Sequence, residues 1–230
     1  MSQVNLIALS QPSAITGCNT AEELVAYAAR VSNPSNQNNT ETAPRLIRYL
    51  IRESHWSPFE MVNLTMEITT TRDISRQIIR HRSFSFQEFS QRYAKSEHFG
   101  LREARLQDPK NRQNSIPIEI PEATGGEGTT STSAERLYEN WNMKQREVIN
   151  TAERVYKWAL DNGIAKEQAR AVLPEGNTET TLYMSGSLRS WIHYCELRRA
   201  NGTQKEHMRV ADQCWEIIGQ HFPSVIEALE

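Results

Sequence analysis

Cysteine is scarce in this chain: Cys18, Cys195 and Cys214 are the only three among 230 residues, and none belongs to a Cys-x-x-Cys pair. An odd number of scattered thiols excludes a disulfide framework or a site of paired cysteines around zinc as the basis of the fold. We therefore expect all three thiols to be reduced. The six histidines never fall in a His-Glu-x-x-His pattern, so we predict no metal site.

Long apolar runs are also missing. No stretch of about 18 apolar residues occurs, and the first residues, Met1–Leu9, lack a basic segment followed by a long apolar one. These absences predict neither a membrane span nor a secretion signal, and we expect a cytoplasmic protein. A net charge of −2 leaves no excess of positive charge to attract nucleic acid over the whole surface, so we expect no nucleic-acid partner.

Glycine gathers in one place, the Gly/Ser/Thr-rich segment at 121–134. A phosphate-binding P-loop needs Gly-Lys-[Ser/Thr] after a buried strand, and this segment has neither. We interpret it as a flexible loop or insertion. The remaining composition, 38% hydrophobic with five Trp, predicts one globular domain over residues 1–230.

Apolar periodicity predicts the secondary structure. Residues 62–68 alternate apolar and polar side chains, which is typical of a strand with one buried face. Thr20, followed three residues later by Glu23, predicts a capped helix start. The other predicted strands cover 4–9, 93–99 and 178–184, with an extended segment at 116–121, and the predicted helices cover 20–31, 43–53, 134–162 and 204–221 or begin near 71, 166 and 185.

These elements predict an α+β fold, a single domain in which a mostly antiparallel sheet packs against several helices. The longest helix, at about 134–162, carries an apolar stripe that we interpret as core: Leu137, Trp141, Val148, Ala152, Val155 and Ala159. The last helix is predicted to turn Met208, Ala211, Trp215, Ile218 and Phe222 inward.

Positive charge is concentrated in one stretch, Arg80–Tyr93, where Arg80, Arg82 and Arg92 stand close to hydroxyls, an amide and the carboxylate of Glu88. Planar guanidinium groups suit phosphate, and aromatic rings can pack on the core or stack on a flat heterocycle. The stretch can therefore bind both ends of a nucleotide. The residues alone leave open an unrelated flavoprotein or an RNA-binding module that stacks bases on the three aromatic side chains, Phe84, Phe86 and Phe89.

The triplet Arg80-His81-Arg82, followed after seven residues by Ser90 and then by Arg92-Tyr93, resembles the signature of the flavin-dependent thymidylate synthases. Two other segments resemble the same family: His-Trp-Ser-Pro-Phe-Glu at 55–60 and Ala-Arg-x-Val-Leu-Pro at 169–174. Gln87 departs from it, since many members have Asn there. Gln keeps the amide group but lengthens the side chain.

The resemblance implies an enzyme that converts dUMP to dTMP. It implies that the carbon comes from methylenetetrahydrofolate, that reducing equivalents come from NADPH through bound FAD, and that a homotetramer shares its active sites between subunits. The resemblance further implies that Arg198 is catalytic. Since an Arg cannot act as a base at neutral pH, we expect its role to be electrostatic.

The same resemblance implies two sets of binding residues. Those implied for dUMP are Gln77, Arg80, Glu88, Phe89, Ser90, Gln91, Arg92, Arg170 and Arg198. Those implied for FAD are His55, Ser57, Arg80, His81, Arg82, Glu88, Ser187, Leu188, Arg189 and His193.

Several of these residues also have a plainer interpretation. A histidine before a Trp-Ser-Pro turn, such as His55, is usually a capping or core-edge residue. The helical face of Asp73 and Gln77 suits solvent, and an isolated Arg170 suits a surface ion pair.

The helix near Ser185 distributes its functional residues over two faces. At 100 degrees per residue, Arg189 and His193 share one face and Arg198 falls nearly opposite. Cys195, three residues before Arg198, is the one cysteine near the expected site, and we interpret it as packing.

Overall fold

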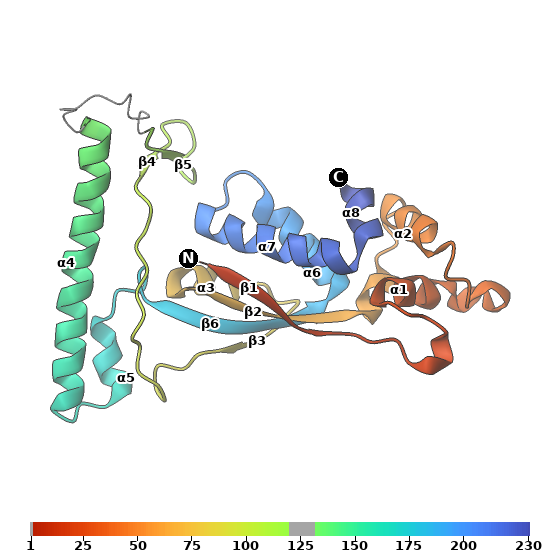
Figure 1. Cartoon of the computed structure of the whole chain (residues 1–230), viewed down its shortest axis with the longest axis horizontal. Helices are drawn as coiled ribbons and strands as arrows, with labels where there is room; N and C mark the ends of the chain where they lie inside the picture. Colours follow the sequence, from red (N-terminus) through yellow and green to blue (C-terminus); the bar gives the residue numbers. More distant parts are fainter. Residues whose placement is uncertain (1, 120–131) are drawn as a thin grey trace, which may run out of the picture.

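A four-stranded antiparallel sheet forms the centre of the protein (Figure 1). The computed structural model describes residues 2–119 and 132–230, so most of the predicted loop at 121–134 lies outside the described residues. The strands follow the order β1 (Gln3–Leu9), β2 (Asn63–Thr71), β6 (Glu179–Ser187) and β3 (Ser85–Glu88). β2 and β6 pair over their whole length, from Asn63 opposite Ser187 to Thr71 opposite Glu179. The predicted α+β class with an antiparallel sheet is confirmed.

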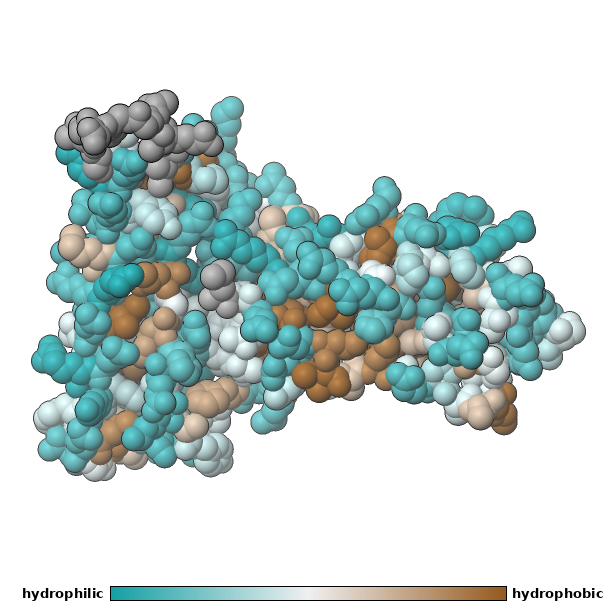
Figure 2. Space-filling view, in the orientation of Figure 1, coloured by the Kyte–Doolittle hydropathy of each residue, from teal (hydrophilic) through white to brown (hydrophobic). Residues whose placement is uncertain are grey.

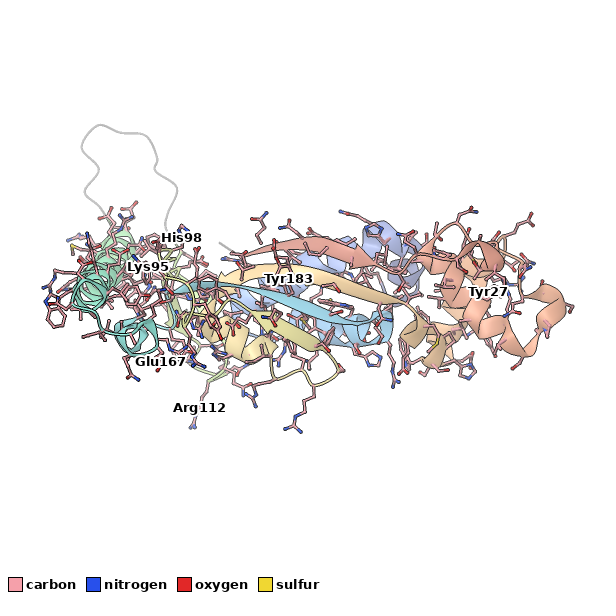
Figure 3. The ribbon with its side chains drawn as sticks, turned by 90° about the horizontal axis from the view of Figure 1, so that it is seen from below. Tyr27, Lys95, His98, Arg112, Glu167 and Tyr183 are labelled. Carbon is pink, nitrogen blue, oxygen red and sulfur yellow. The ribbon has the colours of Figure 1, made fainter. Side chains whose placement is uncertain are left out.

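Two helices, α6 (Leu188–Arg199) and α7 (Lys205–His221), cover one face of this sheet (Figure 1). Trp191 on α6 is fully buried, and its indole Nε1 donates to the carbonyl of Leu64 on β2 at 3.2 Å. The opposite face is polar, and Tyr183 stands on it (Figure 3), donating its hydroxyl to Glu67 Oε2 at 2.9 Å. The alternation of β2 therefore separates a core face from a polar face.

The inward stripe predicted on α7 is mostly confirmed, since Ala211, Trp215, Ile218 and Phe222 are buried. Met208 is only half-buried, and the fully buried residue at that end is its neighbour His207. The prediction was one residue out of phase there because it favoured the apolar side chain.

Three more helices pack at the far end of the sheet: α1 (Ala21–Ala29), α2 (Ala43–Arg52) and α8 (Pro223–Leu229). The capping box at the start of α1 is confirmed, because Thr20 accepts from the Glu23 backbone and Glu23 reaches back to the Thr20 backbone. α8 has no counterpart among the predicted helices. Short 3-10 turns occupy Ala14–Thr16, Arg30–Ser32, Pro34–Asn36, Ser57–Met61 and Arg170–Val172.

The predicted strand at 93–99 is wrong. That segment forms turns and contributes only an isolated bridge between Phe99 and Thr178. The strand lies earlier, at β3, where Ser85 to Glu88 pair with β6. Helix α3 (Arg72–Ile78) also ends sooner than expected, so Arg80 lies beyond the helix that carries Gln77.

The long helix is confirmed as α4 (Ser133–Asp161), but its predicted core stripe is largely wrong. Leu137, Trp141 and Val148 are 47%, 43% and 54% exposed, and Val155 is only half-buried. The helix packs from its middle onward, where Gln145, Ile149, Ala152, Tyr156 and Ala159 are buried, the last two beside α5 (Lys166–Ala169). Figure 1 shows the reason: α4 and α5 stand away from the sheet, next to a small hairpin of β4 (Arg105–Gln107) and β5 (Ser115–Pro117).

Within the described residues, no helix is long and apolar enough to cross a membrane, and no cluster of His, Cys, Asp and Glu could hold a metal ion. Cys195 and Cys214 are fully buried, and burial raises the pKa of both thiols. Because a thiolate is the reactive form, Cys195 is a packing residue, as expected.

Candidate active site

The signature stretch begins at the end of α3 and folds back onto α6. Phe84 packs against Trp191 with ring centroids 4.9 Å apart, and against Tyr194 at 6.0 Å. Gly186 on β6 makes room for it, because a Cβ atom at that position would lie 2.5 Å from the Phe84 ring. Phe84 and Phe86 are therefore packed against the core, and of the three phenylalanines only Phe89 is exposed. This argues against a base-stacking platform for RNA.

Arg198 and His81 are in direct contact. The Arg198 Nε donates to the His81 Nε2 at 2.9 Å, which requires an unprotonated nitrogen on the imidazole. Burial, followed by the charges of Arg198 and Arg80, lowers the pKa of His81 to about 4. His81 is thus a neutral acceptor at pH 7 that fixes the direction of the Arg198 side chain.

A second polar cluster lies beside this contact where α6 and α7 pack together, and the His81 ring lies edge-on to Tyr194 of that cluster with centroids 4.9 Å apart. Gln77 Nε2 donates to Gln204 Oε1 at 2.8 Å, while Gln77 Oε1 lies 3.4 Å from His207 Nδ1. The other ring nitrogen of His207 lies 3.1 Å from the hydroxyl of Tyr194. His207 is fully buried, and burial, then Arg198 and His81, lower its pKa to about 3.

Tyr194, Gln204 and His207 were missed as site residues by sequence reasoning. Their signal was present, since a histidine and a tyrosine stood at inward positions of two helices. Without the crossing of α6 and α7, nothing in the sequence joined them to Gln77.

Glu88 is held inside the protein rather than left open to a ligand. Its carboxylate accepts from Ser75 Oγ at 2.8 Å, from Thr180 Oγ1 at 3.1 Å and from Arg76 NH1 at 3.1 Å. In this structure Glu88 therefore orients a neighbouring arginine, Arg76, through a charge-assisted hydrogen bond.

The remaining residues implied for dUMP lie near α5. Arg92 Nε donates to Glu167 Oε2 at 3.2 Å, and Arg170 Nε donates to the Glu167 carbonyl at 3.3 Å. Glu167 is labelled in Figure 3 at this end of the molecule. Gln91 is buried and donates to Ser96 Oγ at 2.9 Å, and the Ser90 hydroxyl accepts from the Arg92 backbone.

The residues implied for FAD split into two groups. Arg80 and Arg82 are exposed beside His81, and Glu88 is held by Ser75, Thr180 and Arg76, whereas a second group lies around the start of α6 and the turn at 55–60. There Arg189 forms an ion pair with Glu60, and His193 lies edge-on to Trp56 with centroids 4.7 Å apart. Both contacts face the turn at 55–60, and Arg198 faces His81, so the two-face prediction for this helix is confirmed.

Three further residues of the FAD set differ in what they can offer. Ser187 caps α6 by accepting from the Ser190 backbone, and Leu188 is fully buried in the core. His55 is exposed, with its ring edge-on to Tyr49 at 6.1 Å.

The FAD set at 55–60 and 187–193 and the dUMP residue Arg170 lie toward opposite ends of the sheet (Figure 1). Ser187 ends β6 opposite Asn63, and Glu179 begins it opposite Thr71. A strand of nine residues spans about 27 Å at roughly 3.4 Å per residue. One chain therefore does not gather all of these residues into one pocket.

Comparisons with known proteins match most or nearly all of the chain and agree with one another. The family model described as thymidylate synthase complementing protein matches residues 14–224. A probable flavin-dependent thymidylate synthase of Paramecium bursaria Chlorella virus 1 is 50% identical over 226 residues, covering 98% of this chain and 97% of the viral protein. A flavin-dependent thymidylate synthase of Synechocystis sp. is 46% identical over 230 residues, covering 99% of both chains. Among solved structures, the UMP/dUMP methylase PolB from Streptomyces cacaoi, bound with 5-Br dUMP, has a TM-score of 0.78 at 27% identity and covers 99% of this chain and 94% of its own.

Proposed function

This chain belongs to the family of flavin-dependent thymidylate synthases, and from that membership we propose that it makes dTMP from dUMP by reductive methylation. FAD is the proposed flavin, methylenetetrahydrofolate the carbon donor and NADPH the reductant. The proposed site of this reaction is the cytoplasm. The bound flavin supplies the redox chemistry, and the protein supplies binding, orientation and charge.

The contact between Arg198 and His81 is the observation that carries the proposal. An arginine placed beside the uracil carbonyl and N3 stabilises the negative charge that develops as the ring is attacked. A positive charge stabilises the transition state best when its side chain is already in position. The neutral His81 holds the Arg198 side chain in position by accepting from its Nε. The His81 contact leaves the terminal NH2 groups of Arg198 for the substrate, since no other hydrogen bond to this side chain occurs among the described residues.

The nucleotide is held by arginine forks and short donors. Arg80, Ser90, Arg92 and Arg170 bind dUMP in this proposal, together with Gln77, Phe89 and Gln91, while Glu88 acts by orienting Arg76. The common contact of Arg92 and Arg170 with Glu167 supports a shared role for these two guanidinium groups.

The residues near α1 and α2 fit a dinucleotide cofactor. A cavity of about 590 Å³ beside His55 is lined by Arg30, Ser32, Arg45 and Tyr49, among others, which is a common size for a ligand pocket. Cationic groups, hydroxyls and an aromatic ring suit a diphosphate, a ribityl chain and a flat ring respectively. His55, Ser57, Arg189 and His193 border the same end of the molecule and hold the flavin in this proposal.

We further propose the homotetramer with shared active sites. Its support is the separation of Arg170 from the FAD set along β6 and the unburied apolar stripe of α4. Figure 2 shows apolar surface breaking the polar surface on the α4 side of the molecule. A second subunit would bury that stripe and bring the missing residues to the same site.

Product analysis tests the function directly. Purified protein supplied with FAD, NADPH, methylenetetrahydrofolate and dUMP is expected to form dTMP, and omission of any one should stop it. A flavin-dependent oxidation of NADPH that needs no dUMP and yields no dTMP would instead identify an unrelated flavin oxidase.

A further inference from the structure

A second cationic site lies behind the signature stretch. A cavity of about 330 Å³ is lined by Arg72, Arg76, Arg170, Gln91 and Glu175, with smaller side chains completing it. Arg72 and Arg76 carry no role in the dUMP or FAD sets, whereas Arg170 and Gln91 belong to the dUMP set. The cavity therefore joins the proposed nucleotide site to two unassigned arginines.

The charges around this cavity do not balance. Glu88 lies 3.1 Å from Arg76 NH1 and 3.7 Å from Arg72 NH1, and Glu175 lies 3.4 Å from Arg76 Nε. Two carboxylates thus face three guanidinium groups. The pKa of Arg72 is lowered by burial and by the charges of Arg76 and Arg170, against the opposing effect of Glu88 and Glu175.

Arg72 also holds an unused donor. Its NH1 atom is buried and finds no hydrogen-bond partner among the described residues, because the distance to Glu88 is too long for a hydrogen bond. Glu88 is already satisfied by Ser75, Thr180 and Arg76. Leaving a buried donor without a partner costs free energy. Neutralising Glu88 alone therefore does not explain why an arginine stands at position 72.

We propose that Arg72 is a specificity-determining residue that binds the phosphate group of the nucleotide together with Arg170, so that the enzyme selects a nucleoside monophosphate over the free nucleoside. A phosphate monoester brings nearly two negative charges and three acceptor oxygens, which balance the surplus cation and use the idle donor. Gln91 lines this cavity and stands between Ser90 and Arg92 in the signature stretch, so the cavity adjoins further residues of the dUMP set. The inference rests on the proposed function for the identity of the nucleotide.

Titration of full-length, flavin-loaded protein with dUMP, deoxyuridine and inorganic phosphate tests the proposal. Arg72→Met should weaken dUMP binding by about tenfold to a hundredfold, since a hydrogen bond to a charged group is lost, and leave deoxyuridine binding unchanged. Arg48→Met is the matched control, because Arg48 forms an exposed ion pair with Glu227 and should change neither affinity. Arg72→Lys keeps the positive charge but loses the planar guanidinium, so it should bind dUMP more tightly than Arg72→Met and less tightly than the wild type. It replaces the Met variant in this test if that variant does not fold.

Equal loss of dUMP and deoxyuridine binding in Arg72→Met would overturn the proposal, as would unchanged binding of both. Weaker retention of FAD with normal dUMP affinity would also overturn it, by assigning the cavity to the diphosphate of the flavin. If the wild-type protein formed no dTMP, the proposed function would fail. The Arg72 site would still be tested by whether inorganic phosphate binds the wild type more tightly than Arg72→Met.

Discussion

At the scale of single residues, the site depends on groups that stay neutral while surrounded by arginines. His81 accepts from Arg198, the His207 ring lies 6.4 Å from that of His81, and both imidazoles are held unprotonated because burial and nearby positive charge lower their pKa. A protonated His81 would repel the guanidinium that it now accepts from. Because both histidines are neutral, Arg198 is the only charged side chain of these three.

Replacement of Arg198 should separate catalysis from cofactor binding. Arg198→Ala is expected to lower the turnover rate about a hundredfold, equivalent to about 3 kcal/mol of lost transition-state stabilisation, with flavin content unchanged. Steady-state rates and the flavin absorbance of the purified variant measure the two effects. Arg199→Ala is the control on the same helix, since Arg199 pairs with Asp212 away from His81. Near-normal dTMP formation by Arg198→Ala would remove the role given to it.

The two neutral histidines make stability depend on pH in a known direction. An unfolded histidine titrates near pH 6.5, whereas folded His81 and His207 titrate at about 4 and about 3. Between these values the unfolded chain binds more protons than the folded one, so the free energy of unfolding falls as the pH is lowered from about 6.5 toward 4. Urea unfolding at several pH values measures the slope. His207→Leu should make it shallower, and an unchanged slope in that variant would show that His207 does not contribute.

At the scale of elements, sequence patterns predicted secondary structure correctly where the result does not depend on which other segment packs against it. The alternation in β2 and the capping box of α1 depend on neighbouring residues, and both are confirmed. The predicted strand at 93–99 was wrong because aromatic residues near a turn, here Tyr93 and Phe99, do not specify which segment pairs with β6. Likewise the periodicity of Leu137, Trp141 and Val148 predicted a helix correctly, but periodicity does not say what covers the stripe.

The candidate site divides in the same way. The family resemblance pointed to Arg80, His81 and Arg198, and helical spacing correctly predicted that Arg189 and His193 share one face of α6. Tyr194 and His207 escaped because their contact is made between two helices. Arg72 escaped because a charged residue at the start of a helix is usually solvated.

The packing of β3 against β6 depends on Gly186. A Cβ atom at this position would overlap the Phe84 ring, so Gly186→Ala should displace the signature stretch and cost about 1–3 kcal/mol through overpacking. Gly176→Ala is the matched control, because nothing lies within 4 Å of its added Cβ atom. Urea unfolding and dUMP affinity check both variants. Equal stability of the two would mean that Phe84 repacks freely.

At the scale of the whole molecule, shared active sites predict complementation between inactive variants. Arg170→Ala and Arg198→Ala lie in different groups of the proposed site, so a mixed tetramer regains some sites in which both residues are intact. Co-expression, or mixing after mild dissociation, should give more dTMP than either variant alone. Wild-type subunits mixed with a chain that carries both changes serve as the positive control for assembly. No gain from the mixed single variants would contradict shared sites.

The few contacts that hold α4 against the rest of the protein should make its backbone amides exchange hydrogen quickly. Trp141 Nε1 and Gln145 Nε2 both donate to the carbonyl of Arg102, at 3.0 and 2.9 Å, and the apolar side chains that α4 buries among the described residues are Ile149, Ala152, Tyr156 and Ala159. So few contacts give α4 a low free energy of local opening, while amides of β2 and β6 exchange only when the whole domain unfolds. In an isolated subunit, deuterium should therefore enter α4 long before it enters the sheet. If neighbouring subunits cover the exposed stripe, its protection should rise with protein concentration, and the exchange rate of this one helix then measures the assembly equilibrium without any label at the active site.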